Sequence, residues 1–503
     1  MREHAAHGRR LSAVGLAFAL LAAGCGTRVP DHEVRAALAA SPASGAIPAA
    51  PEAEAIDGVA TPVPAGESAE LAPATAPNGG GAPAAPPASA GSPGGGGKGG
   101  AKKSSACTSN PGATEVGVTK TAIRVGASYS ESSLIPGQFR PAMDAISAYA
   151  TMLNREGGVC GRGLDFHFHN DGLNAQKYGE NVRHLVEQDQ VFALLGGLSA
   201  SDSGGCGYMA GQAPPTGVPD VGTFALNYCR SQHPTYFSPM GSLKQGIYGC
   251  CVDWDWLKAR FGLTKPAVHW LDVEISRDQG LAVVDALART LNLAGRDQVF
   301  QGEHSPAQFS FAGDVRDMQS AGVDGVWSSM DINGNVKLIR AMCQAEWYPK
   351  VVHVEISAYD PQLIERIGAD CVAKQNIWMR SFHRAFTAPN AEIALYVKEL
   401  KAFCPSCRPT TFGLEGWLSA KLFVEVLEAV GPNLTRPAFF QAMNAMKDWD
   451  GGGVMGPNTP SDRLIYHCNF MIHVRPDGFF QERDLACGEF YASGDHTGPA
   501  VGP

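Results

Sequence analysis

The stretch that decides the fold of this chain is residues 191–223, VFALLGGLSASDSGGCGYMAGQAPPTGVPDVGT. Its first five residues are apolar, too few for an ordinary helix, and end at Gly196-Gly197, so they predict a buried strand. A loop of small hydroxyl residues follows, then a helical patch around Tyr208 and a second short strand near 217–222. Such a β-loop-α-β unit can present serine hydroxyls and helix N-terminal N–H groups to a carboxylate, although most Gly/Ser loops after strands bind nothing.

The rest of the chain divides by composition. Its 503 residues are too many for one compact core. Residues 26–114 are, up to about Ala106, nearly all Ala, Pro, Gly and Ser, which bury too little apolar surface to fold, and we expect a disordered tether there. The net charge of −9 gives no support to nucleic-acid binding. A small solute is the remaining kind of partner.

Residues 1–25 have the features of a targeting segment. Arg9 and Arg10 precede the apolar run LSAVGLAFALLAAG, which is short for a membrane span but suits a signal peptide. The run ends in small residues before Cys25, which resembles a bacterial lipobox with Cys25 as the lipidated residue. A plain secretory signal with a chance cysteine is the alternative. The tether favours the lipoprotein, anchored to the membrane in the extracytoplasmic cell envelope, because an anchored domain needs a spacer.

The cysteine count agrees with export. Twelve cysteines remain besides the lipobox residue: Cys107, Cys160, Cys206, Cys229, Cys250, Cys251, Cys343, Cys371, Cys404, Cys407, Cys468 and Cys487. Oxidising conditions outside the cytoplasm allow up to six disulfides among them. Cys206 and Cys229 are plausible partners because they follow consecutive strands. We expect the adjacent Cys250 and Cys251 to pair with different partners rather than with each other.

Enzymatic and metal-binding interpretations find little support. Cys404 and Cys407 suit a local disulfide, or two separate bridges, better than half a zinc site or a redox pair, because no second CxxC is present. His167 and His169 lie two apart on a predicted strand and could ligate a metal, but a third ligand is not identifiable. No GxSxG, HExxH or Walker A phrase occurs in a suitable context. We therefore expect no catalytic site, no metal and no cofactor.

The order of predicted elements indicates an α/β fold. Strand, helix, strand, helix and strand follow one another from residue 119 into the opening stretch, which is typical of a doubly wound parallel sheet. The pattern starts again after about residue 242, with a helix expected over 247–260. From residue 391 the chain becomes helical, and it closes with two β segments joined by a turn at Asp477-Gly478.

Four phrases, in this order, resemble a known family. They are LNREGGVCGRGLDF, the VFALLGGLSAS to GVPDVGT unit, FGLEGWLSAKLFVEVLEAVGPNLTRPAFFQAM, and GGGVMGPNTPSDR followed by the final hairpin. Their order and spacing are similar to those of type I solute-binding proteins of ABC transporters, the class that includes the leucine/isoleucine/valine-binding proteins. The resemblance implies two Rossmann-like lobes with parallel sheets and a ligand cleft between them, closing by a hinge motion.

The resemblance also implies the domain boundaries. The two-lobed ligand-binding domain would span 115–490. Lobe one would comprise 115–243 and 378–450, and lobe two 244–377 and 451–490, with a flexible tail at 491–503.

The same resemblance implies which residues contact a ligand. They are Ser199, Ala200, Ser201, Thr223, Phe224 and Ala225 in lobe one, and Arg277 and Glu355 in lobe two. Asp331, at the end of the predicted strand segment GVWSSMD, is a further candidate because an ammonium needs an acid. The family's key serine falls on Ala200, so Ser199 or Ser201 would supply the hydroxyl, and Leu226 stands where another hydroxyl is expected. Glu355 or Asp331 would pair with a ligand's ammonium, because a buried charge without a partner is costly. The alternative is that Glu355 is an exposed acid at the end of a strand and has no role in ligand binding.

These observations predict the lipid-anchored solute-binding component of an ABC importer. It would capture an amino acid, an amide or a related small organic compound and deliver it to a membrane permease. A sensor or adhesion lipoprotein on the same fold, without a transporter, is the first alternative. An exported α/β enzyme is the second.

Overall fold

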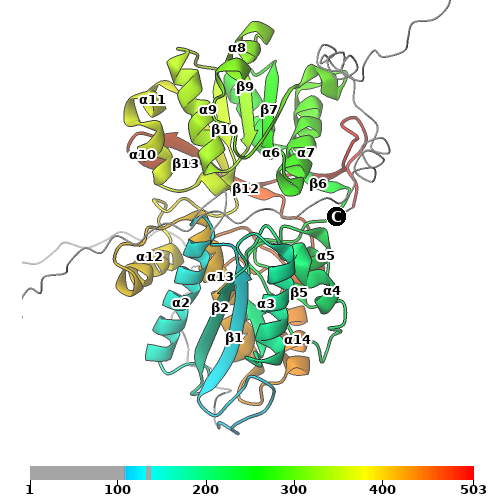
Figure 1. Cartoon of the computed structure of the whole chain (residues 1–503), viewed down its shortest axis with the longest axis vertical. Coiled ribbons are helices and arrows are strands. Elements are labelled where there is room, and N and C mark those ends of the chain that lie inside the picture. The colour runs from blue at the N-terminus through cyan, green and yellow to red at the C-terminus, as the bar shows by residue number, and fades with distance from the viewer. Residues whose placement is uncertain (1–106, 108, 132–136, 503) are drawn as a thin grey trace, which may run out of the picture. The chain divides into compact units, whose positions relative to one another are not determined.

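The computed structural model describes residues 107, 109–131 and 137–502 (Figure 1). The predicted signal peptide at 1–25, Cys25 within it and nearly all of the predicted tether lie outside these residues. Within the described part of the chain, no helix is both long and apolar enough to cross a bilayer.

The first lobe contains a five-stranded parallel sheet in the order β2-β1-β3-β4-β5. Its strands are β1 (Ala122–Tyr129), β2 (Gly163–Asn170), β3 (Ala193–Leu195), β4 (Asp220–Val221) and β5 (Tyr236–Phe237). Its helices are α2 (Arg140–Arg155), α3 (Ala175–Glu187), α4 (Cys206–Met209), α5 (Tyr228–Ser231), α12 (Ala391–Phe403), α13 (Thr411–Val430) and α14 (Arg436–Ala445). The neighbours Leu194 and Leu195 pack into apolar clusters on opposite faces of the sheet, so the VFALL run is a buried central strand.

Helix α13 reaches the first lobe from far along the sequence. It packs against α2, where Trp417 meets Tyr149 with ring centroids 4.7 Å apart. A Cβ at Gly416 would lie 2.5 Å from the carbonyl oxygen of Ala142, so only glycine allows the two helices to approach this closely. The FGLEGWLSAK phrase therefore completes the core of the first lobe.

The second lobe contains a seven-stranded sheet in the order β13-β12-β11-β10-β9-β7-β8. Its strands are β7 (Pro266–Leu271), β8 (Phe300–His304), β9 (Gly325–Ser329), β10 (Val351–Val354), β11 (Ile377–Ser381), β12 (Cys468–Arg475) and β13 (Gly478–Cys487). Its helices are α6 (Val252–Phe261), α7 (Glu274–Leu291), α8 (Ala312–Ala321), α9 (Ile332–Gln344), α10 (Gln362–Ile367) and α11 (Ala369–Lys374). Strands β7 to β11 are parallel, and β12 and β13 form the predicted closing hairpin. The predicted α/β fold with two mainly parallel sheets is confirmed.

The boundary between the lobes differs from the predicted one. Strand β11 belongs entirely to the second sheet, where it pairs with β10 on one side and β12 on the other. Its residues Ile377 and Met379 pack into the second lobe's core. The segment of the first lobe that was predicted to begin at 378 therefore begins after Ser381.

Two local expectations are also wrong, one in the middle of the chain and one at its C-terminal end. Residues 247–260 do not form one helix, because the chain runs as strand β6 (Ile247–Cys250) before α6 begins at Val252. The partner of β6 is β14 (Glu489–Ala492), which pairs with it in antiparallel register. The predicted flexible tail at 491–503 therefore starts inside a strand, and the backbone N–H of Gly494 donates to Asp285 on α7 at 2.7 Å.

The last residues of the predicted tether pack against the first lobe. The hydroxyl of Thr114 donates to the carbonyl of Leu434 at 2.6 Å, and Arg162 donates to the carbonyl of Gly112 at 2.8 Å. Cys107 forms a disulfide with Cys160, just before β2. Because these residues have fixed partners, the folded domain starts before residue 115.

All twelve described cysteines are paired. The bridges are Cys107–Cys160, Cys206–Cys229, Cys250–Cys251, Cys343–Cys371, Cys404–Cys407 and Cys468–Cys487. The pairing of Cys206 with Cys229 and the local bridge at Cys404–Cys407 are as predicted. The expectation for Cys250 and Cys251 is wrong, because the other ten cysteines are used in five bridges and leave these two with each other.

Candidate functional site

A cavity of about 360 Å³ lies where the strand ends of both sheets meet. The first lobe contributes the loops after β3 and β4, with Ala200 and Phe224 in the wall. The second lobe contributes Leu271 at the end of β7, Ser329 at the end of β9 and Glu355 just after β10. The carboxyl ends of parallel strands are the usual ligand position in α/β folds, and the volume suits a small organic molecule.

The serines of the loop after β3 have different surroundings. Ser199 is fully buried and accepts a hydrogen bond from the backbone N–H of Ser201 at 2.9 Å. Its hydroxyl also lies 3.0 Å from that of Ser130, which donates to Asp171 at 2.7 Å. Ser201 and Ala200 line the cavity, whereas Ser199 does not. Of the two candidate hydroxyls, that of Ser201 is the one placed at the cavity.

The loop after β4 contributes apolar side chains. Phe224 and Leu226 line the cavity. Thr223 is fully buried, with its hydroxyl 3.4 Å from the carbonyl of Gly197, and Ala225 is buried away from the cavity wall. This loop therefore presents no side-chain hydroxyl to a ligand.

The buried side chain of Arg230 connects the loop after β3 to the loop after β4. Arg230 donates two hydrogen bonds to Asp220, at 2.9 and 3.0 Å, and a third to the carbonyl of Gly197 at 3.1 Å. The same guanidinium lies 3.6 Å from the carboxylate of Asp202. That carboxylate accepts the backbone N–H of Leu226 at 2.8 Å. One charge cluster thus fixes the loop after β3 relative to the loop after β4.

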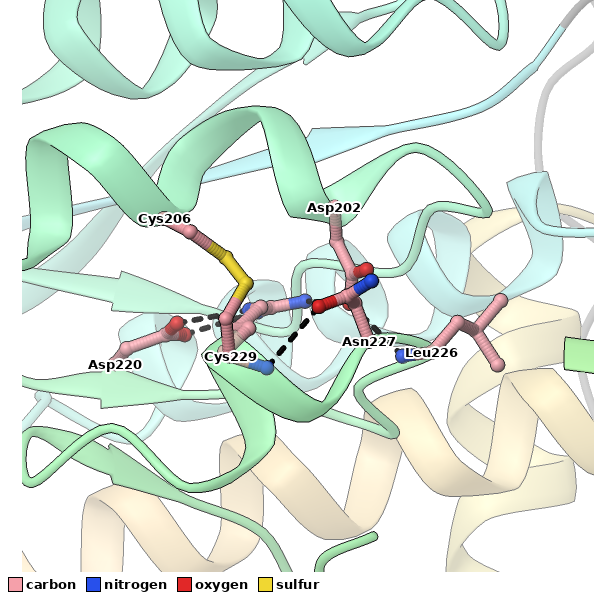
Figure 2. The surroundings of a disulfide bond; sticks show 7 residues. Asp202, Cys206, Asp220, Leu226, Asn227 and Cys229 are labelled. Atoms are coloured by element: carbon pink, nitrogen blue, oxygen red, sulfur yellow. Dashed lines mark hydrogen bonds and ion pairs between the residues drawn. A yellow bond between two sulfur atoms is a disulfide. The ribbon is translucent and has the colours of Figure 1, made fainter. Parts of the chain in front are cut away.

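A disulfide reinforces this arrangement. Figure 2 shows the Cys206–Cys229 bond beside Asp202 and Asp220, joining the helical turn after the first loop to the helix after the second.

Burial raises the pKa of Asp202 to about 6, although the charge of Arg230 opposes that shift.

The second lobe places two predicted acids at the cavity. Asp331 caps helix α9 by accepting the backbone N–H of Gly334 at 2.8 Å, and it lines the cavity. Glu355 also lines the cavity, but it accepts a hydrogen bond from Arg380 at 2.9 Å. Arg277 does not line it, because its guanidinium pairs with Glu303 and Asp272 at the surface.

The structure therefore brings five of the nine predicted residues together in one cavity wall. These are Ala200, Ser201, Phe224, Asp331 and Glu355. The other four lie outside it: Ser199, Thr223, Ala225 and Arg277.

Helix α13 supplies two wall residues that the sequence interpretation missed, Phe412 and Glu415. Glu415 is 3 % exposed, its Oε2 has no hydrogen-bond partner among the described residues, and burial raises its pKa to about 8. Its carboxyl is therefore mostly protonated at pH 7 and can donate a hydrogen bond. The sequence feature that could have identified this wall residue is a glutamate within the otherwise apolar FGLEGWLSAK phrase.

The wall is acidic and apolar. Its carboxyl groups belong to Glu274, Asp331, Glu355 and Glu415, and no Lys, Arg or His is among the described residues that line it. The apolar part comes from both lobes and includes Phe139, Leu198, Phe224, Met330, Ile356 and Phe412. This combination suits a ligand with an amine and an apolar body.

The two predicted metal-ligand histidines do not converge. His167 lies 3.2 Å from Asp165, whereas His169 lies 3.3 Å from Asp189 and groups with His184. This arrangement gives the His167 and His169 pair no shared site.

Two α/β lobes whose strand ends enclose one cavity define a bilobal ligand-binding protein. The chain belongs to the periplasmic binding protein family, whose model matches residues 122–478. Among curated proteins, none matches the chain in sequence.

Solved structures share the fold at low sequence identity. A leucine binding protein from Thermotoga maritima is 13% identical, with a TM-score of 0.58, and the match covers 73% of this chain and 99% of that one. A fatty acid ABC transporter substrate-binding protein from Thermomonospora curvata is 16% identical, with a TM-score of 0.60 and coverages of 76% and 98%. A putative branched-chain amino acid ABC transporter from Rhodospirillum rubrum is 17% identical, with a TM-score of 0.53 and coverages of 72% and 99%. At these sequence identities the structural similarity establishes the fold alone.

Proposed function

We propose that this protein is the extracytoplasmic solute-binding component of an ABC importer and captures a small amine-bearing ligand in the 360 Å³ cavity. The observation that carries the proposal is a cavity whose wall is shared by both lobes, because closure of the lobes then buries the ligand. The protein performs no chemistry on the ligand and hands it to a membrane permease. Solved relatives named for leucine, branched-chain amino acids and fatty acids support a small solute as cargo.

The charges of the wall favour an amine over a simple fatty acid. A fatty acid carboxylate would meet acidic residues and no cation among the described lining residues, and leaving such a charge without a partner is costly. An ammonium can pair with Asp331, while the apolar side chains receive the ligand's body. The hydroxyl of Ser201 and the protonated carboxyl of Glu415 can donate to the ligand's carbonyl or carboxylate. An amino acid or its amide meets all these conditions.

We also propose that Cys25 is lipidated and that the segment ending near residue 106 tethers the binding domain to the membrane. The lipobox-like residues before Cys25 and the low-complexity composition that follows support this proposal. Incorporation of radiolabelled palmitate into the expressed protein tests it, with Cys25→Ser as the control. Equal labelling of the wild-type protein and the Cys25→Ser variant would refute Cys25 as the lipidated residue.

A thermal-shift screen of the full-length protein tests the ligand class. Leucine, leucinamide, phenylalanine and phenylalaninamide are compared with octanoate at matched concentrations. A ligand at about a hundred times its Kd adds roughly 2.7 kcal/mol of stability. We expect the amines to raise Tm and octanoate to leave it unchanged, and Ala200→Trp to abolish the shift by filling the cavity. A shift with octanoate alone would overturn the amine assignment.

A further inference from the structure

A second cavity, of about 470 Å³, adjoins the first. Four residues line both cavities: Phe224, Ile275, Gln279 and Phe382. The second cavity extends from them toward β6, α6 and α7, and includes Tyr466 from the segment before β12. Its volume alone is within the range of a complete small-molecule site.

The wall of the second cavity is rich in flat, apolar groups. Aromatic rings come from Phe224, Tyr228, Tyr248, Trp254, Phe382 and Tyr466. The Cys250–Cys251 disulfide and the side chain of Ala282 on α7 also line it. Such a wall suits an aromatic ring, which gains both apolar burial and favourable ring contacts.

The charges in this wall balance, because it holds three basic side chains (Lys244, Arg296 and Arg380) and three acidic ones (Asp253, Asp278 and Asp285). Arg296 pairs with Asp285, and Asp278 accepts the hydroxyl of Tyr228 at 3.2 Å. A ligand group with a net charge would therefore gain no net attraction from the wall as a whole. The wall favours a neutral ligand group.

Four residues in this wall each have a buried polar atom without a hydrogen-bond partner among the described residues. The atoms are Nε1 of Trp254, Nε of Arg380, the hydroxyl oxygen of Tyr248 and Oδ2 of Asp253. Trp254 is 2% exposed and Asp253 is 3% exposed. Two N–H donors, one hydroxyl and one carboxylate acceptor left unpaired in a cavity wall are costly to the protein alone. An amide supplies the matching groups, because its carbonyl accepts and its N–H donates.

We propose that the second cavity binds the distal part of the same ligand, an aromatic group attached through an amide, while the ligand's amine occupies the first cavity. The cargo is then an elongated amine of dipeptide size. This inference rests on the proposed function and specifies its substrate class. Continuity of the two walls at Phe224, Ile275, Gln279 and Phe382 lets one molecule span both cavities.

Calorimetric titration of the full-length protein tests the proposal with leucinamide and leucyl-phenylalaninamide as probes. The wild-type protein is expected to bind the longer probe at least tenfold more tightly, with one molecule per chain. Ala282→Trp fills the second cavity and is expected to remove this preference without changing leucinamide affinity. Ala200→Trp fills the first cavity and is expected to weaken both probes. If Ala282→Trp does not fold, Trp254→Phe, which keeps the ring and removes the donor, is expected to reduce the preference severalfold.

The outcomes separate this inference from the proposed function. Equal affinity of both probes for the wild-type protein, or a preference that survives in Ala282→Trp, would overturn the inference and leave an amine binder. Binding of two probe molecules per chain would overturn it in favour of two separate sites. If neither probe binds the wild-type protein, the amine assignment fails and the inference falls with it.

Discussion

Arg380 on β11 donates a hydrogen bond to Glu355, at the end of β10, across 2.9 Å. The acid that the sequence assigns to a ligand's ammonium therefore already has a cationic partner within the protein. Glu355 lines the first cavity and Arg380 the second, so this ion pair lies where the two cavities adjoin. The acids left for an ammonium in the wall of the first cavity are Glu274 and Asp331, and Asp331 accepts hydrogen bonds from Gly334 and Asn333 but forms no ion pair among the described residues.

Glu355→Gln should lower stability because it leaves the mostly buried Arg380 without its counter-charge. Removal of one partner of a buried pair costs about 3 kcal/mol. The double variant Glu355→Gln/Arg380→Met should recover much of that loss, since no lone charge remains. Urea denaturation of the wild type, the single and the double variant measures both effects. Additive losses in the double variant would show that the pair is not coupled.

Asp331→Asn should weaken leucinamide binding about tenfold or more, because it removes a carboxylate available to the ammonium. Asparagine is as good a helix N-cap as aspartate, so α9 should keep its start and Tm should change little. Arg277→Gln is the matched control, since Arg277 pairs with Glu303 and Asp272 outside the cavity. Calorimetric titration of both variants checks the contrast. Equal affinities would remove Asp331 from the site.

Removal of the Cys206–Cys229 bridge by double substitution to alanine should lower stability by roughly 3 kcal/mol, the size expected for a loop of this length. Ligand affinity should also fall, because the bridge supports the loops that carry Ala200 and Phe224. The control is the same substitution at Cys404–Cys407, which closes a much shorter loop and lines no part of the cavity. Denaturation and titration should show the ligand effect for the first bridge alone.

Glu415 should make the protein less stable as pH rises from about 5 to 8. Its pKa is raised to about 8 in the folded state, so the folded protein holds a proton that the unfolded chain has already released. One such proton changes the free energy of unfolding by about 1.4 kcal/mol per pH unit, and stability falls as the pH increases. In Glu415→Gln this contribution disappears, while that of Asp202, whose pKa is about 6, persists. Urea denaturation at pH 5, 6, 7 and 8 gives the change of stability with pH for the wild type and for Glu415→Gln. The same pH dependence in both proteins would contradict the raised pKa of Glu415.

The element order could be predicted because it depends on local patterns. The apolar VFALL run, bounded by glycines, forms the central strand β3, and the closing hairpin follows its Asp477-Gly478 turn. The loops that meet the cavity could also be located, since they follow buried strands. The strand β6 was missed because its partner β14 lies more than two hundred residues away.

The orientation of individual side chains at the site could not be predicted. Ser199 turns away from the cavity because Ser130, far away in the sequence, lies within hydrogen-bonding distance of its hydroxyl. Glu355 is paired because β11 places Arg380 beside it. Glu415 enters the wall because Gly416 lets α13 approach α2 closely. Each of these outcomes depends on a tertiary contact that leaves no local pattern.

The Cys107–Cys160 bond has a mechanical consequence. Residues 109–114 are joined to the first lobe by hydrogen bonds, such as that of Thr114 to Leu434, and bonds of this kind can break one after another under load. A pull on the chain from its N-terminal side reaches Cys107 first and passes through the covalent bond to Cys160, next to β2. The disulfide thus shields residues 109–114 from load, and the first lobe bears any tension applied to the chain before Cys107.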